Sequence, residues 1–203
     1  MEKAILNNNI VILGNFKPAT FDKLFMIKSG LVEDGEFLDE SIFSPDYALI
    51  VTEKLLFEIE KNKVSLNFKD DKLIKEGEKI TKIFKNSDIK AFGFNFKRAL
   101  ILDDFNQYKK FFYFENNVLN KHFDGNETTY GYYVSKDFED YRLSLNIKPL
   151  KLQKIEEEEE EMDALDFNFN FHFSKGDLIK ELSNALKYEN ITVGILNDYE
   201  RNY

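Results

Sequence analysis

The sequence predicts an α+β fold in which a mixed, mostly antiparallel sheet carries helices on one face. Several segments alternate apolar and polar residues with a period of two, which is typical of half-buried strands. Other segments space their apolar residues at helical intervals. Through the first half, residues 1–102, the two kinds of segment follow one another as strand, helix, strand, strand, helix, strand. This order is the ferredoxin-like βαββαβ arrangement.

The elements of the first half follow from local patterns. Residues 9–16 contain a short apolar run with β-branched residues that is ended by Gly14 and Asn15, so they predict a strand. A helix is expected over 19–30, with Thr20 as its cap and Gly30 at its end. The remaining segments predict two strands within 47–69 with a hinge at 60–63, a helix over 72–87 and a strand over 89–102.

The second half, residues 103–203, begins with aromatic residues at helical spacing, which predict a helix packed on the sheet. Two segments with period-two alternation follow, on either side of the run Glu156–Glu161. We expect these segments to form an antiparallel hairpin. The glutamate run is expected to be a solvated loop, because blocks of like charge repel one another and stay hydrated. The C-terminal segment predicts a helix that starts at Ser174, which forms an imperfect capping box with Asp177 three residues later, and that is broken near Asn190.

The strictest alternation lies in residues 162–173, where phenylalanines at every second position alternate with asparagine and histidine. Successive side chains of a strand point to opposite faces, so this strand has one apolar and one polar face. The same split occurs in residues 92–97 and 141–148. Burying one phenyl ring is worth about 1.5–3 kcal/mol in transfer free energy, so the aromatic face is expected to form the core. An RNA-recognition sheet would instead present its aromatic residues on the open face.

The polar face of these three strands is the candidate binding surface. Its side chains can donate hydrogen bonds to a partner, and its amides can also accept them. The candidate partner-binding residues are Asn95, Lys97, Arg142, Asn146, Lys148, Asn168, Asn170 and His172. The alternative interpretation is an ordinary solvated face of an antiparallel sheet.

Composition narrows the classes of function. A chain of 203 residues without a Pro- or Gly-rich linker is expected to form a single compact domain, residues 1–203. The absence of cysteine excludes disulfide scaffolds, thiolate metal sites and cysteine nucleophiles. A net charge of −9 and only 3 arginines do not fit a general phosphate-backbone binder, so no nucleic-acid partner is expected. No apolar run has the roughly 18 residues of a membrane span, and no signal peptide is evident, so we expect a cytoplasmic protein.

Motifs for common enzyme chemistry are absent from the sequence, which has no phosphate-binding loop, dinucleotide fingerprint, zinc-protease helix or nucleophile elbow. His122 and His172 would need carboxylates from elsewhere to hold zinc, so we interpret them as ordinary polar residues. We therefore expect no cofactor and no catalytic residue. One enzymatic alternative stays open. The spacing of Asp46, Asp70 and Lys72 resembles the P-D…D-x-K pattern of metal-dependent nucleases, in which two acids hold Mg²⁺ near an attacking water.

Three hypotheses about function follow, and the first is preferred. It is a non-enzymatic protein–protein interaction or accessory subunit of a bacterial or phage multi-component system, such as a defence or immunity system. The source is inferred from 25 lysines against 3 arginines and from 20 asparagines, which are typical of AT-rich genomes. The other hypotheses are a Mg-dependent nuclease or phosphodiesterase, and a small-ligand binding domain with a cleft lined by Tyr130, Tyr132 and Tyr133. A protein partner is expected, and a homo-oligomer is a second assembly to consider.

Overall fold

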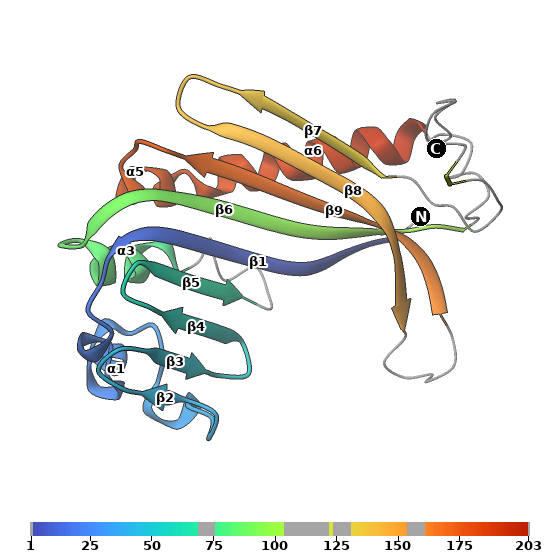
Figure 1. The fold of residues 1–203 in the computed structure, drawn as a ribbon. Coiled ribbons are helices and arrows are strands. Elements are labelled where there is room, and N and C mark those ends of the chain that lie inside the picture. The colour runs from blue at the N-terminus through green and yellow to red at the C-terminus, as the bar shows by residue number, and fades with distance from the viewer. Residues whose placement is uncertain (1, 69–75, 104–121, 124–130, 154–160, 203) are drawn as a thin grey trace.

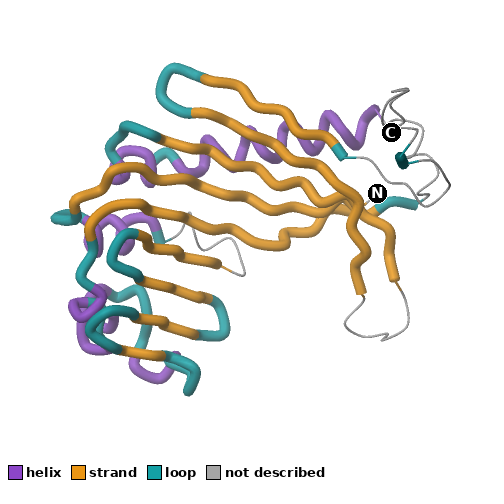
Figure 2. Tube along the Cα trace, viewed as in Figure 1, coloured by secondary structure: helices purple, strands orange, loops and turns teal. Residues whose placement is uncertain are grey.

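The computed structural model describes residues 2–68, 76–103, 122–123, 131–153 and 161–202. Within this part of the chain the fold is α+β, with one nine-stranded antiparallel sheet and four α-helices. Figures 1 and 2 show long central strands that lie side by side and curve together, with the helices gathered on one side of them. The predicted fold class is therefore confirmed at this level, although the sheet is wholly antiparallel rather than mixed.

The sheet has the strand order β2-β3-β4-β5-β1-β6-β9-β8-β7. The two longest strands, β1 and β6, have 14 residues each and pair with one another near its centre. The strands are β1 (Glu2–Asn15), β2 (Ile42–Phe43), β3 (Ala48–Val51), β4 (Leu55–Ile59), β5 (Lys63–Phe68), β6 (Asp88–Ile101), β7 (Tyr132–Asp137), β8 (Arg142–Gln153) and β9 (Glu161–Phe173).

The helices lie between these strands and after them in the chain. They are α1 (Lys23–Ser29), α3 (Gly77–Phe84), α5 (Leu178–Ser183) and α6 (Ala185–Asn202), together with the short 3-10 helices η1 (Pro18–Thr20) and η2 (Asp34–Glu36). Among the described residues, no helix is long and apolar enough to cross a membrane.

The ferredoxin-like order expected for residues 1–102 is not found. Four strands, β2 to β5, lie between α1 and α3 where two were predicted, and they form an antiparallel meander that ends beside β1. The predicted hinge at 60–63 is present as the turn between β4 and β5. A further turn, in which Leu55 N donates to Thr52 Oγ1 at 2.9 Å, divides the first predicted strand into β3 and β4. The strand β2 has only two residues, so it is too short to be predicted from an alternation of apolar and polar residues.

Helix boundaries differ from the prediction at three places. Asp177, rather than Ser174, caps α5, because its carboxylate accepts a hydrogen bond from Ile179 N at 2.9 Å. Asp22 rather than Thr20 caps α1, because its carboxylate accepts a hydrogen bond from Phe25 N at 2.7 Å. Thr20 instead ends η1. The C-terminal segment is broken at Asn184, between α5 and α6, rather than near Asn190.

The hairpin predicted on either side of the glutamate run is confirmed, because β8 and β9 pair antiparallel along most of their length. Glu161, the last residue of the run, is the first residue of β9 and pairs with Gln153. It is therefore part of a strand rather than of the predicted loop. The other glutamates of the run and nearly all of the aromatic helix predicted at the start of the second half lie outside the described residues.

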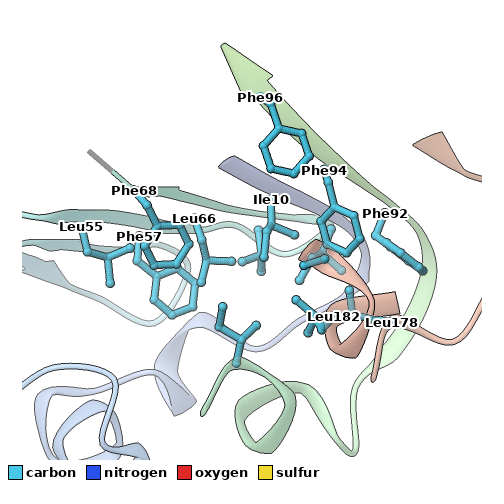
Figure 3. Close-up of a cluster of buried hydrophobic side chains, with 14 of the residues drawn as sticks. Ile10, Leu55, Phe57, Leu66, Phe68, Phe92, Phe94, Phe96, Leu178 and Leu182 are labelled. Atoms are coloured by element: carbon cyan, nitrogen blue, oxygen red, sulfur yellow. The ribbon is translucent and has the colours of Figure 1, made fainter. Parts of the chain in front are cut away.

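The core lies between one face of the sheet and the helices, as the close-up in Figure 3 shows for part of it. We call this side of the sheet the phenylalanine face. The phenylalanines that two adjacent strands contribute to it are at most 2% exposed, namely Phe92, Phe94 and Phe96 on β6 and Phe167, Phe169, Phe171 and Phe173 on β9. The rings of Phe92 and Phe173 stack with centroids 4.6 Å apart. Tyr188 of α6 packs on the same cluster, with its ring centroid 5.1 Å from that of Phe171. The predicted aromatic core is confirmed.

Candidate interaction surface on the polar face of the sheet

The structure brings the predicted partner-binding residues together on three adjacent strands, β6, β9 and β8. They all lie on the side opposite the phenylalanine face, which we call the polar face. Asn95 lies opposite Asn170, and His172 lies opposite Arg142. The other four also occupy neighbouring cross-strand positions. Lys97 faces Asn168, Asn168 faces Asn146, and Lys148 lies beside them on β8, opposite Asp166.

One line of uncharged polar residues crosses the polar face at right angles to the strands. Its first four members are asparagines that lie directly opposite one another, and we call them the amide row: Asn67 on β5, Asn9 on β1, Asn95 on β6 and Asn170 on β9. Two serines, Ser144 on β8 and Ser135 on β7, continue the line to the edge of the sheet. Register therefore aligns small neutral side chains over six neighbouring strands.

The amide row is joined by side-chain hydrogen bonds that all run in the same direction. Asn170 Nδ2 donates to Asn95 Oδ1, and Asn95 Nδ2 donates to Asn9 Oδ1. Asn9 Nδ2 then donates to Asn67 Oδ1 at 3.1 Å, and Asn67 Nδ2 donates to Ser65 Oγ at 3.1 Å. Each amide has a second N–H and further acceptor capacity beyond these bonds. The row is thus a fixed set of half-buried donors and acceptors.

Charged side chains lie on both sides of the amide row. On one side Arg142 forms a two-point ion pair with Asp137, with Nε–Oδ1 and Nη2–Oδ2 distances of 2.6 and 3.0 Å. The hydrogen bonds from Arg142 hold the pKa of the Asp137 carboxyl below its ordinary value. On the other side Lys97 and Lys148 approach Asp166. Opposite charges are therefore paired on this face, which stays close to neutral.

Asp166 is the exception on the polar face, because it is only 1% exposed. Lys97 Nζ lies 3.4 Å and Lys148 Nζ 3.8 Å from its Oδ2, and neither oxygen accepts a hydrogen bond within the described part of the chain. A buried carboxylate of this kind depends on nearby cations to offset its lost hydration. Lys97 and Lys148 therefore stabilise the buried carboxylate of Asp166, besides any role in binding.

A second buried charge lies on the phenylalanine face. Arg98 of β6 donates to Asn8 Oδ1 at 2.7 Å and to Glu189 Oε1 of α6 at 3.2 Å. Burial lowers the pKa of its guanidinium, an effect that Glu189 opposes. This cluster ties β1, β6 and α6 together inside the protein, so it is a structural element and not part of the candidate surface.

Sequence reasoning missed half of the amide row. Residues 9–16 were predicted as the first strand, whereas β1 begins at Glu2 and includes three successive asparagines. Their alternation was a usable signal, because Asn9 follows the polar pattern, while Asn8 shares the buried side with Ile10. Asn67 was equally visible, two residues from Ser65 on a predicted strand. Their meeting with Asn95 depends on strand order, which the local sequence does not specify.

The residues of the other hypotheses do not lie on this surface. Asp46 is exposed, and its Oδ1 lies 2.8 Å from Lys61 Nζ. Asp70 and Lys72 lie outside the described residues, so the nuclease alternative stays a prediction. His122 is exposed, and the part of the chain that the structure describes contains no group of three or more His, Asp or Glu side chains that could hold a metal ion.

The tyrosines proposed for a ligand cleft do not share one face. Tyr132 and Tyr133 are consecutive residues of β7, so their side chains point to opposite sides of the sheet. Tyr130 lies outside the described residues. A groove of about 490 Å³ lies elsewhere, between α3 and α5, where Thr81 and Leu186 are among its lining residues. The small-ligand alternative thus stays a prediction without these tyrosines forming a common cleft.

Comparison with known proteins identifies no family for this chain. The chain matches no protein-family model, and no curated protein resembles it at a significant level.

Proposed function

We propose that this protein is a non-enzymatic interaction subunit that binds a protein partner through the polar face of its sheet. The observation that carries the proposal is the amide row, a line of hydrogen-bonded neutral side chains across four neighbouring strands. Side chains held in this way lose little conformational entropy when a partner binds, which favours affinity.

The chemistry of the face favours a protein over a nucleic acid. Three bases, Lys97, Arg142 and Lys148, lie near two acids, Asp137 and Asp166, so these five groups sum to +1. Nucleic-acid binding requires several unpaired cations that displace counterions from phosphates. Asparagine side chains instead offer the same donor and acceptor groups as a peptide bond, so they suit backbone and amide groups of another protein.

The biological setting of the proposal rests on composition alone. The excess of lysine over arginine and the many asparagines favour an AT-rich bacterial or phage genome. An accessory subunit of a multi-component system, with defence or immunity as one setting, is consistent with a binding face that carries no catalytic group.

The test is to isolate the partner and then alter the face. The tagged chain is expressed in its native host, co-purifying proteins are identified, and the partner is purified for calorimetry. Asn146→Arg and Asn168→Arg change exposed side chains of the polar face. We expect each to raise the Kd at least tenfold, which corresponds to about 1.4 kcal/mol, because a bulky charge would be desolvated at the interface.

The matched control is Asn190→Arg, the same chemical change at an exposed position of α6. It lies on the helical side of the molecule and should leave the Kd within about twofold. Partner binding that is equally strong in both polar-face variants and in the control would refute the proposed site, provided that thermal melts show all three variants folded.

A further inference from the structure

The two edges of the sheet differ in their capacity to pair with another strand. At one edge β2 has two residues, whereas at the other edge β7 has six, and every residue of β7 is exposed. Figure 1 shows β7 as the outermost strand on its side of the sheet. Proteins usually shorten or charge an edge strand, or place proline in it, because its unpaired backbone groups can bind another chain. β7 contains no proline and one residue of each charge, Lys136 and Asp137.

The backbone of β7 presents a free set of donors and acceptors. Successive residues of a strand direct their N–H and C=O groups alternately to either side. Phe138 N donates to Tyr141 O at 2.8 Å, which places even-numbered residues on the side of β8. The outward set is therefore Tyr133, Ser135 and Asp137, and among the described strands none pairs with it.

Little charge opposes the approach of an identical strand. The carboxylate of Asp137 is held in its two-point ion pair with Arg142. The ammonium of Lys136 lies over the ring of Phe138, 5.0 Å from its centroid. The other four side chains of β7 are uncharged. Val134 and Phe138, the residue that follows the strand, are 56% and 41% exposed. Such an edge gains apolar contacts when it is covered.

We propose that β7 pairs antiparallel with β7 of a second copy of this chain, about a two-fold axis at Ser135. In this register Ser135 lies opposite its own counterpart, Tyr133 lies opposite Asp137, and Val134 lies opposite Lys136. Each outward residue then exchanges two backbone hydrogen bonds with its partner. The inference does not depend on the function proposed for the polar face.

Charge and strand length select this register. Centring the axis on Lys136 or on Asp137 would place like charges directly opposite one another, which is destabilising. Centring it on Val134 would leave Asp137 to pair with Gly131, outside the strand. Only the axis at Ser135 gives all three outward residues partners within β7 and separates the like charges.

A two-fold axis perpendicular to the sheet keeps the two polar faces on the same side. The line of Ser144 and Ser135 then continues directly into the same residues of the second copy, so the two amide rows lie on one continuous surface. One strand per copy forms a contact at the small end of specific interfaces. We therefore expect a reversible dimer with a Kd on the order of 10 µM.

The substitution Ser135→Pro tests the pairing between the two β7 strands selectively. The N–H of Ser135 points outward, so Ser135→Pro removes a donor of the proposed interface without removing a hydrogen bond between β7 and β8. Sedimentation of the full chain from about 1 to about 100 µM should show a monomer–dimer equilibrium that this variant abolishes. Ser135→Ala keeps the N–H and should dimerise as the wild type does.

Cysteine at the same position tests the register. The chain has no cysteine, and directly opposed residues of a hydrogen-bonded pair have Cα atoms about 5.5 Å apart, within the range for a disulfide. Mild oxidation should link Ser135→Cys into a covalent dimer, whereas Ser183→Cys on α5 should form no covalent dimer under the same conditions. A wild type that is monomeric throughout the concentration range would overturn the proposal. So would a dimer that persists in Ser135→Pro, or an oxidised Ser135→Cys that forms no covalent dimer.

Discussion

The two faces of the sheet are built from the same strands, yet they hold those strands together in different ways. On the phenylalanine face, Phe94 and Phe171 gain from any apolar neighbour, because burial has no directional requirement. On the polar face, Asn95 gains only where Asn9 and Asn170 present the correct atoms. The first face therefore supplies most of the stability, and the second discriminates between alignments.

Register illustrates this division. If β6 slid by two residues past β1, Ile10 would still face a phenylalanine, Phe92 or Phe96 instead of Phe94. The apolar contacts would change little. On the other side, Asn9 would face Gly93 or Lys97 in place of Asn95, and the amide row would be interrupted. A shift by two residues leaves each side chain on its own face of the sheet but interrupts the amide row. The amides therefore help to specify the register between β1 and β6.

The largest effect is expected from the phenylalanine face. Phe169→Ala should lower the free energy of unfolding by about 3–5 kcal/mol, because truncating a fully buried ring loses transfer free energy and leaves a cavity. Asn168→Ala, one residue earlier on β9 and exposed on the polar face, should change it by less than about 0.5 kcal/mol. Chemical denaturation measures both. Equal losses at the two positions would contradict the division between the faces.

An intermediate effect is expected where the polar face contains a buried charge. The double substitution Lys97→Met and Lys148→Met leaves Asp166 without cations and should destabilise the protein by about 1–3 kcal/mol. This is less than for a fully buried pair, because the lysine side chains are 39% and 59% exposed. Adding Asp166→Leu should restore most of the loss, since no buried carboxylate then remains. A triple variant as unstable as the double variant would mean that the lysines act through packing instead.

The smallest effect is expected from the amide row. Asn95→Ala removes two side-chain hydrogen bonds from a half-buried site that water can reach, so a loss of about 1 kcal/mol is expected. The side-chain amide resonances of Asn9 and Asn170 should shift in the NMR spectrum, since each loses its bond to Asn95. Unchanged resonances at both neighbours would show that the row does not act as a connected unit.

The local sequence pattern was sufficient to predict which face of each strand is buried, but not which strands lie next to one another in the sheet. The alternation of Phe169 with Asn170 predicted which side would be buried, since the direction of a side chain depends only on position along its own strand. It could not predict that β1 lies between β5 and β6, which is what brings Asn9 to Asn67 and Asn95. Strand order is set by contacts between residues far apart in sequence. The predicted residues therefore lie together on one face of three adjacent strands, whereas Asn9 and Asn67, on β1 and β5, were not among them.

Short local features were predicted least well. Thr20 and Asp22 are both plausible caps, and the choice between them depended on a preceding 3-10 turn that has no period to detect. Similarly, the break at Asn184 is a single residue between two helices, whereas the apolar pattern continues across it. Such details depend on how the chain must turn to cover the sheet, and this follows from the packing of α5 and α6 on the core.

The hydrogen bonds of the amide row run in a single direction across the polar face, from β9 to β5. Every amide donates in the same sense, so the carbonyl oxygen of Asn170 begins the chain and the hydroxyl of Ser65 ends it. Rotating one amide by half a turn would set donor against donor, so the four can reverse only together. Hydrogen bonds in series also polarise one another. A donor bound at Asn170 would therefore polarise the neighbouring bonds of the row, whose far end at Asn67 lies three strand spacings or about 14 Å away.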